Sequence, residues 1–421
     1  MKPTQRLTTL LGLTLYSLLS AQSFRRDTDT IVMNPGYRYQ VYYQLSSERQ
    51  DTALRCGWHL AFEVPIRGAA IRANHPCGVS IYKTTRDTSG WTQLTLNDTV
   101  HPLYDNLCRW DIGAFNTTKG SSAFDVGWGL YSINDHITRG DSLYIIRIGN
   151  AFKKLWIQRL QGTEYFIRVA ELDGSRDTTY AVRKTLAPER NFVYLNLLTH
   201  RVFSVEPPAQ EWDLVFTQYT KPLPLPDNPT TLIPYNLVGV LMNNGVRATR
   251  IRLPRNGNPD TLRPTHYALD SCISLIGDDW KFFDRNTGQW TLADTLYFLI
   301  RDKRGNLWRM RFIGFEGSTT GRAVVEKTLL QRAGGTSLPT AFVQDIRVYP
   351  QPAEEGVFIE FPQPFSGKVE LFTLRGEKLF SLTVQNQEQI YIPRPSGGTR
   401  GAYWLHLHTS SGVWGKLVIF N

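Results

Sequence analysis

The stretch Trp58-His59-Leu60-Ala61-Phe62 decides how the chain is organised, because it returns 154 positions later as Trp212-Asp213-Leu214-Val215-Phe216. Two further segments return at nearly the same offset, Asp141–Arg147 as Asp294–Arg301 and Leu155–Arg159 as Leu307–Arg311. A period of about 150 residues corresponds to a whole domain, and not to one unit of a solenoid. We therefore predict two tandem domains, residues 22–185 and residues 186–335.

Both copies have the sequence pattern of β-structure. Large apolar residues alternate in the two quoted stretches, so we expect them on one face of a strand. Leu143–Ile146 and Leu296–Leu299 are continuous apolar runs, which suit strands buried on both faces. Gly305-Asn306 is a hairpin signal between two such runs. No segment has the pattern of a long helix, and the predicted fold class is all-β.

Residues 341–421 form a third predicted unit, in which short apolar runs alternate with turn residues, the pattern of a β-sandwich. Val348-Tyr349-Pro350-Gln351-Pro352, Gly401-Ala402-Tyr403-Trp404-Leu405 and Lys416-Leu417-Val418-Ile419 follow one another in this unit. Their order resembles the C-terminal sorting domain of the type IX secretion system, although Gln351 stands where that family usually has Asn. The resemblance implies an Ig-like sandwich, passage across the outer membrane, and release or attachment at the cell surface.

The first 21 residues have the parts of a secretory signal peptide. Lys2 and Arg6 are a positive start, Leu7–Leu19 is apolar, and Leu19-Ser20-Ala21 is a small-residue cleavage site. The apolar part is shorter than the ~20 residues of a transmembrane helix. We expect this segment to be removed, and we predict no transmembrane segment elsewhere.

The four cysteines fit an oxidising compartment without making a disulfide-dense scaffold. Cys56 and Cys77 flank an expected hairpin centred near residue 66, which places the two thiols opposite each other and predicts a disulfide. Cys108 and Cys272 are interpreted as buried free thiols. The absence of a Cys-x-x-Cys pair argues against a zinc site and a thioredoxin-type site.

The order of segments in each copy resembles the HmuY-like family of haem-binding surface proteins, with an early Trp-Asp-Leu-Ala-Phe-type strand and a later strand–turn–strand unit. The second copy matches the first motif best, and His59 replaces its Asp in the first copy. The resemblance implies haem held by axial side chains, commonly a histidine pair, because neutral imidazole is a good iron ligand. The candidates are His75, His101 and His266, which lie in turn or loop sequences. The alternative is that they are ordinary exposed loop histidines.

Four further residues are candidates for a ligand or anion surface. Trp110 and Trp280 lie in Gly- and Asp-rich stretches outside the strong strands, whereas Trp58 and Trp212 are expected in core packing. Alternation sends Arg250 and Arg252 to one strand face, where arginine suits the carboxylates of haem propionates or a surface polysaccharide. A plain solvated face is the alternative.

No catalytic motif is present in the sequence: there is no Gly-x-Ser-x-Gly, no His-Glu-x-x-His and no Gly-rich phosphate loop. The formal net charge of +10, from 47 basic and 37 acidic residues, suggests a nucleic-acid partner at first. However, residues 22–185 carry 20 basic and 16 acidic side chains and residues 186–340 carry 18 and 14, so each copy contributes only +4. We do not expect nucleic acid to bind.

These observations predict a non-enzymatic binding protein that is secreted or held at the cell surface. Its predicted partners are the type IX secretion machinery and, from the resemblance, haem. The alternative is a structural or adhesive surface protein, including one that binds carbohydrate, which keeps the fold without a haem site.

Overall fold

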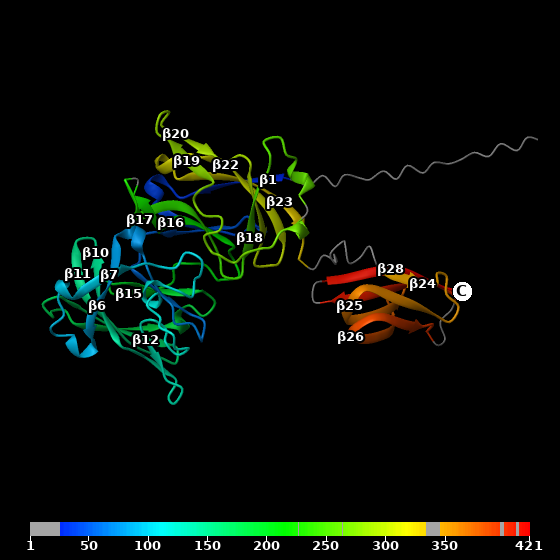
Figure 1. The fold of residues 1–421 in the computed structure, drawn as a ribbon, viewed down its shortest axis with the longest axis horizontal. Coiled ribbons are helices and arrows are strands. Elements are labelled where there is room, and N and C mark those ends of the chain that lie inside the picture. The colour runs from blue at the N-terminus through cyan, green and yellow to red at the C-terminus, as the bar shows by residue number, and fades with distance from the viewer. Residues whose placement is uncertain (1–25, 226, 263, 334–345, 396–399, 410–411) are drawn as a thin grey trace, which may run out of the picture.

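The computed structural model describes residues 26–225, 227–262, 264–333, 346–395, 400–409 and 412–421. Within these ranges the chain is all-β, as predicted (Figure 1). The predicted signal peptide, residues 1–21, lies outside the described residues. Short 3₁₀ turns connect the strands: η1 (Pro35–Tyr37), η2 (His75–Cys77), η3 (Thr88–Gly90), η4 (Leu96–Asp98), η5 (Ala114–Asn116), η6 (Lys184–Leu186), η7 (Pro259–Thr261), η8 (Pro264–His266) and η9 (Gly317–Thr319).

The first sandwich is built from one continuous stretch of chain. One of its sheets has the order β15-β14-β4-β5, and the other has the order β13-β12-β11-β10-β6-β7 with β8 and β9 attached through β11. Phe62, Tyr144, Tyr165 and Val193 are among the buried side chains of the core between the sheets. The strands are β4 (Leu60–Glu63), β5 (Ile71–Ala73), β6 (Val79–Asp87), β7 (Thr99–Leu103), β8 (Gly129–Tyr131), β9 (Ile137–Gly140), β10 (Ser142–Ile148), β11 (Ala151–Gln161), β12 (Glu164–Glu171), β13 (Thr178–Arg183), β14 (Phe192–Asn196) and β15 (Arg201–Phe203).

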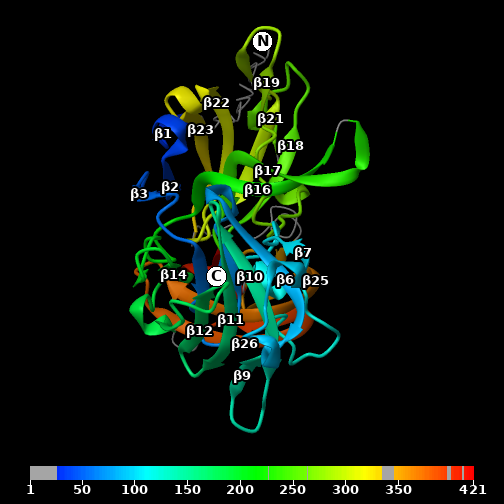
Figure 2. The same cartoon turned by 90° about the vertical axis from the view of Figure 1, so that its left-hand side faces the viewer.

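The second sandwich is built from two separate stretches of chain. Its sheets have the orders β17-β16-β2-β3 and β1-β23-β22-β21-β18, with the small hairpin β19–β20 beside them. Figure 2 shows the blue N-terminal strand β1 beside the yellow strand β23. The strands are β1 (Arg26–Val32), β2 (Tyr39–Tyr43), β3 (Gln50–Leu54), β16 (Leu214–Leu225), β17 (Asn228–Met242), β18 (Arg247–Arg252), β19 (Lys281–Asp284), β20 (Gln289–Leu292), β21 (Leu296–Arg301), β22 (Leu307–Phe315) and β23 (Arg322–Gln331).

The two sequence copies exchange a hairpin. Hairpin β2–β3, which precedes β4 in the first copy, pairs with β16 of the second copy. Hairpin β14–β15, which precedes β16, pairs with β4 of the first copy. The strand pairing therefore does not follow the predicted division into residues 22–185 and 186–335. The first sandwich spans β4 to β15, and the second needs the N-terminal strands β1–β3 to be complete.

Both exchanged hairpins use the same register. Val41, Tyr42 and Tyr43 of β2 pair with Phe216, Val215 and Leu214. The equivalent residues of β14, Val193 to Leu195, pair with Phe62, Ala61 and Leu60 in the same order. Since β4 and β16 carry the repeated motif, each presents the same partner surface to a hairpin. The sequence repeat is therefore also a repeat of pairing geometry.

One position of the repeated motif anchors the exchanged hairpin. It is occupied by His59 in the first copy and by Asp213 in the second. Asp213 is buried, and its carboxylate accepts hydrogen bonds from the backbone N–H of Leu45 and of Lys303, both at 2.8 Å. His59 Nδ1 accepts one from the N–H of Leu197 at 2.9 Å. Leu45 and Leu197 are equivalent residues of the repeat, so the two different side chains satisfy the same backbone donor.

Two disulfides close the repeat region. Cys56 is bonded to Cys77, which fixes the connection between β3 and β4 to η2 of the first sandwich. Cys108 is bonded to Cys272 and joins the two sandwiches across 164 positions of sequence. The interpretation of Cys108 and Cys272 as free thiols is therefore wrong. The two cysteines belong to different sandwiches, and the local spacing of residues does not show which segments of the two sandwiches meet.

The C-terminal unit has an apolar core of its own, which includes Val357, Val369, Leu405 and Leu407. Its sheet has the order β24-β25-β27-β28, and β26 pairs with β25. The strands are β24 (Arg347–Tyr349), β25 (Gly356–Thr373), β26 (Lys378–Pro393), β27 (Gly401–Thr409) and β28 (Gly412–Phe420).

Candidate functional site

The two hairpin-bearing sheets face each other, and a cavity lies between them. Buried aromatic and aliphatic side chains cover both outer faces, and Trp110 packs against each of them. The space has a volume of about 100 Å³, and we call it the inter-repeat cavity. Its lining includes Gln40, Tyr42, Trp58, Arg72, His75, Asp105, Trp110, Tyr194, Glu206, Trp212, Thr217 and Tyr219.

The hairpin exchange brings equivalent aromatic residues together in this lining. Tyr42 of β2 packs edge-on against Trp212, with ring centroids 5.0 Å apart. Tyr194 of β14 packs edge-on against Trp58 at 5.1 Å. Each pair joins one sequence copy to the other, so the aromatic lining repeats with the fold. We expected each tryptophan to share one strand face with the leucine and phenylalanine of its motif, and this is wrong. Strands β4 and β16 begin two residues after the tryptophans, and only the leucine and phenylalanine side chains enter the sandwich cores.

Three buried polar atoms on lining residues have no hydrogen-bond partner among the residues that the structure describes: Trp58 Nε1, Trp212 Nε1 and His75 Nε2. Trp212 has only 2% of its surface exposed, so water does not readily replace a partner there. A buried polar group without a partner is costly, at about 1–3 kcal/mol each. All three atoms belong to residues that line the inter-repeat cavity, but the atoms themselves are buried, so a ligand reaches them only if lining side chains move.

The hydrogen bond at the other ring nitrogen fixes the chemistry of His75. Nδ1 lies 3.0 Å from the carbonyl oxygen of Val79, which only accepts, so Nδ1 carries the proton. Burial lowers the pKa of His75, which keeps the ring neutral. The unpartnered Nε2 is therefore a lone-pair acceptor, whereas the two indole N–H groups are donors.

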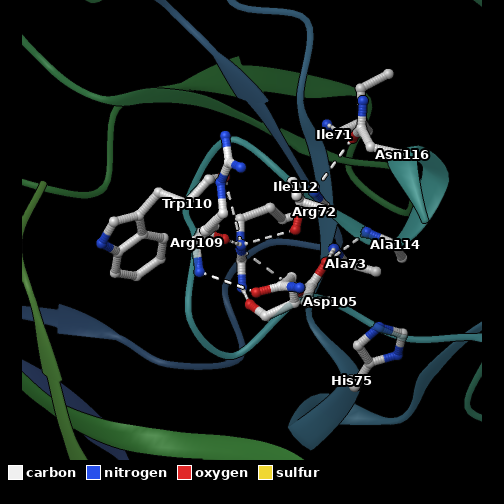
Figure 3. A network of polar contacts seen from close by, with 12 residues as sticks. Ile71, Arg72, Ala73, His75, Asp105, Arg109, Trp110, Ile112, Ala114 and Asn116 are labelled. Atoms are coloured by element: carbon white, nitrogen blue, oxygen red, sulfur yellow. Dashed lines mark hydrogen bonds and ion pairs between the residues drawn. The ribbon is translucent and has the colours of Figure 1, made fainter. Parts of the chain in front are cut away.

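The guanidinium of Arg72 is used by the protein itself. It donates to the carbonyl oxygens of Asn106, Arg109, Trp110 and Ile112 and lies 3.7 Å from the carboxylate of Asp105 (Figure 3). It also lies 4.9 Å from the ring of Trp110. These contacts fix the loop of residues 105–112 against β5, and they leave Arg72 in a structural role.

The carboxyl group of Glu206 is also used within the fold. It accepts hydrogen bonds from the backbone N–H of Phe192 and from the side-chain amide of Asn191. Burial raises the pKa of Glu206 to about 8. At neutral pH the inter-repeat cavity therefore carries little free charge.

The loop of residues 105–112 holds the sandwiches together beside the cavity. Trp110 Nε1 donates to the carbonyl oxygen of Met242 in the second sandwich at 2.8 Å. The backbone N–H of Ile273 donates to the carbonyl of Cys108, next to the disulfide with Cys272. The cavity wall is thus fixed by covalent and hydrogen bonds.

The predicted site residues are dispersed over the molecule. His101 on β7 and His266 in η8 are exposed, and neither of them joins His75 in the lining of the cavity. Arg250 and Arg252 are exposed on β18, and Arg250 is paired with Asp279 at 2.7 Å. Only His75 and Trp110 of the predicted residues line the cavity.

Trp280 is not a surface residue. It is 2% exposed, its ring stacks on Phe312 at 3.6 Å, and its N–H donates to the carbonyl of Gly277. The prediction of an exposed platform at Trp280 is wrong, because a Gly- and Asp-rich sequence context does not exclude burial. Sequence reasoning missed Tyr42, Tyr194 and the cavity-lining role of Trp58 and Trp212. The recurrence of Val41-Tyr42 as Val193-Tyr194 was the signal that points to them.

Comparison with known proteins identifies the C-terminal unit. Residues 347–421 match the family model described as secretion system C-terminal sorting domain. An all-β chain with this domain is a secreted or cell-surface protein, exported by the type IX secretion system, as predicted. No curated protein is found to match the chain. The comparisons give no support to the HmuY-like resemblance of the two repeats or to haem binding, and both stay predictions.

The structure also bears on the predicted lack of a membrane span. None of the helical segments in the described ranges is long and apolar enough to cross a membrane.

Proposed function

We propose that the exported protein is a non-enzymatic binding protein and that the inter-repeat cavity is its ligand site. The observation that carries this proposal is the pair of equivalent tryptophans that line the cavity and whose buried indole N–H groups have no hydrogen-bond partner among the described residues. The neighbouring charged groups, Arg72 and Glu206, are engaged in framework hydrogen bonds, which leaves recognition to neutral groups and aromatic faces.

The experiment is a binding screen on residues 22–333 with intrinsic tryptophan fluorescence as the readout. A ligand that enters the cavity changes the emission of Trp58 and Trp212 and raises the melting temperature by mass action. Trp212→Phe keeps an aromatic ring but removes one donor, and it is expected to weaken binding. Trp290→Phe, at a 37% exposed residue that does not line the cavity, is the matched control and is expected to bind as wild type. If ligands bind but Trp212→Phe behaves as wild type, the site lies elsewhere.

Haem is the second candidate, because His75 has the arrangement of an axial ligand, with one nitrogen donating to a carbonyl and the other free. The size of the cavity argues against it: about 100 Å³ is well below the roughly 300–1,000 Å³ of ordinary ligand pockets. Haem titration of residues 22–333 tests it directly. A Soret band identical to that of free haem would end the haem hypothesis, and a shifted band that disappears in His75→Ala would establish it.

A further inference from the structure

We propose that the edge of the second sandwich at β18 binds an acidic polysaccharide through exposed arginine side chains. This surface is separate from the inter-repeat cavity, and the inference does not depend on the function proposed for that cavity. It rests on three observations: arginines without acidic partners along β18, a like-charge pair between β18 and β21, and an open groove beside β18.

Strand β18 is an edge strand of the five-stranded sheet and carries three exposed arginines (Figure 2). Arg250 is paired with Asp279 at 2.7 Å. Arg247 and Arg252 have no ion pair with any residue that the structure describes, and the same holds for the exposed Arg255 in the loop that follows. These guanidinium groups are therefore available to an external anion.

Two of the arginines on this sheet face each other. Arg247 stands directly opposite Arg301 of β21. Their neighbours Ala248 and Ile300 point into the core, so by alternation both arginines lie on the outer face of the sheet. Arg301 donates to the carbonyl oxygen of Gly305 at 3.0 Å, but within the described ranges neither arginine has an acidic partner. Like charges in directly opposite positions destabilise a sheet, and an anion between them removes that repulsion.

Protection of the sheet edge does not account for this arrangement. Charged side chains commonly prevent an edge strand from pairing with another chain. Here, however, the edge is already covered, because Ala248 exchanges two backbone hydrogen bonds with Asp270, at 2.9 and 2.8 Å. Arg247 lies next to this bridge, so its charge is not needed to block strand addition at that point.

An open groove of about 690 Å³ lies between β18 and residues 268–275. This volume is within the roughly 300–1,000 Å³ of ordinary ligand sites. Arg247 and Arg250 line the groove, and both side chains are exposed, so a ligand reaches them without movement of the fold. Their planar guanidinium groups match the two oxygens of a carboxylate. Thr249 and Ser271 add hydroxyl groups, and Asp270 is the acidic residue of the lining, so the arginines outnumber it.

The exposure of these arginines favours a polymer over a small anion. A single ion pair between exposed groups contributes little to binding. Arg247 and Arg252 are five residues apart, which corresponds to about 17 Å along a strand. A polysaccharide with a carboxylate on each sugar contacts several arginines at once, and its affinity rises through multivalency. The lining of the groove has no aromatic side chain on which a nucleobase could stack, which argues against a nucleic acid.

The test measures binding of polygalacturonate to the exported chain, residues 22–421, by biolayer interferometry. Methyl-esterified polygalacturonate is the neutral counterpart of the same polymer, and double-stranded DNA is a polyanion that carries phosphate. We expect the acidic polymer to bind at least tenfold more tightly than its methyl ester. Its affinity should fall about tenfold between about 50 and about 300 mM NaCl, because salt screens exposed charges.

The variants locate the binding surface. Arg247→Gln and Arg252→Gln are each expected to weaken binding about three- to fivefold, and Arg247→Lys less than Arg247→Gln, because lysine keeps the charge but not the planar fork. Arg67→Gln is the matched control. Arg67 is an exposed arginine between β4 and β5, without an ion pair among the described residues, and its loss changes the net charge equally. Arg67→Gln should bind as wild type.

A melting curve separates lost binding from lost folding. Arg247→Gln removes the like-charge pair with Arg301, so without ligand it should melt no lower than wild type. Trp212→Phe, at the inter-repeat cavity, should bind polygalacturonate as wild type, so failure of the cavity proposal leaves this one standing.

Three results would overturn the inference. The first is no binding of polygalacturonate at low salt. The second is an equal loss of affinity in Arg247→Gln and Arg67→Gln, which would assign binding to net charge alone. The third is tighter binding of DNA with the same dependence on Arg247, which would make the partner a nucleic acid.

Discussion

Deleting residues 26–54 removes β1, β2 and β3 from the second sandwich and leaves every strand of the first intact. The deleted segment contributes four fully buried aliphatic side chains to the second core, Ile31, Met33, Val41 and Leu45. At about 1.5–3 kcal/mol for each buried side chain, their loss amounts to about 6–12 kcal/mol. A domain has a total stability of only about 5–15 kcal/mol, so we expect the second sandwich to unfold.

The assay is amide hydrogen exchange with limited proteolysis on residues 55–340, compared with residues 22–340. We expect protection to persist from β4 to β15 and to disappear from β16 to β23. A synthetic peptide of residues 26–54 should restore protection when it is added, because β16 and β23 keep the edges to which β2 and β1 pair. Residues 22–340, which also lack the sorting domain but keep β1–β3, are the control and should stay protected in both sandwiches.

One result would refute this reasoning about the exchanged hairpins. If β16 to β23 stay protected in residues 55–340, the second repeat completes its own sheets and the N-terminal strands are dispensable. Loss of protection in both sandwiches would contradict the independence of the first core.

Three further predictions concern residues 22–333. Cys272→Ser opens a ring of 164 positions and should reduce the free energy of unfolding by about 5 kcal/mol under non-reducing conditions, as measured by urea denaturation. Asp213→Ala leaves two buried backbone N–H groups unpaired and should cost about 2–6 kcal/mol, whereas His59→Ala leaves one and should cost about 1–3 kcal/mol. Burial raises the pKa of Glu206 from 4.5 to about 8, so the native state binds more protons than the unfolded state and stability falls as the pH rises from 4.5 to 8. Glu206→Gln should therefore melt at a higher temperature than wild type at pH 8.5, with little difference at pH 4.

Each of these predictions has an outcome that contradicts it. Equal unfolding midpoints for Cys272→Ser and wild type would show that hydrogen bonds alone hold the sandwiches together. A larger loss for His59→Ala than for Asp213→Ala would reverse the assignment of their anchoring roles. A wild-type melting profile for Glu206→Gln across the pH range would show that Glu206 is ionised without cost.

The sequence predicted the repeat because identical packing demands left similar residues 154 positions apart, at Trp58 and Trp212. It did not predict the exchange, because alternation identifies a strand and its buried face but not its partner. Strands β4 and β16 offer the same register, so pairing within a copy and pairing between copies look alike in sequence. The sequence shows that His59 stands where the second copy has Asp213. Only the structure shows that both side chains accept a hydrogen bond from an equivalent backbone N–H group.

The candidate site was harder to predict than the fold. The cavity lies between faces that belong to different repeats, so its residues are distributed from Gln40 to Leu241 without a local motif. The histidines were chosen for their expected loop context. His101 and His266 are both exposed, but His101 lies on strand β7 and not in a loop, and a loop context does not show which residues come together. The disulfide between Cys108 and Cys272 was missed for the same reason: both partners depend on how the sandwiches meet.

The pairing of β1 with β23 has a consequence for the order of synthesis and export. Strand β1 is synthesised first but pairs with β23, which ends at Gln331. The match to the sorting-domain family begins soon afterwards, at residue 347. A chain that stops before β23 leaves β1 without its partner strand and also lacks the sorting domain. Completion of the second sandwich therefore requires almost all of the chain that precedes the sorting domain, so that folding and eligibility for secretion are acquired together.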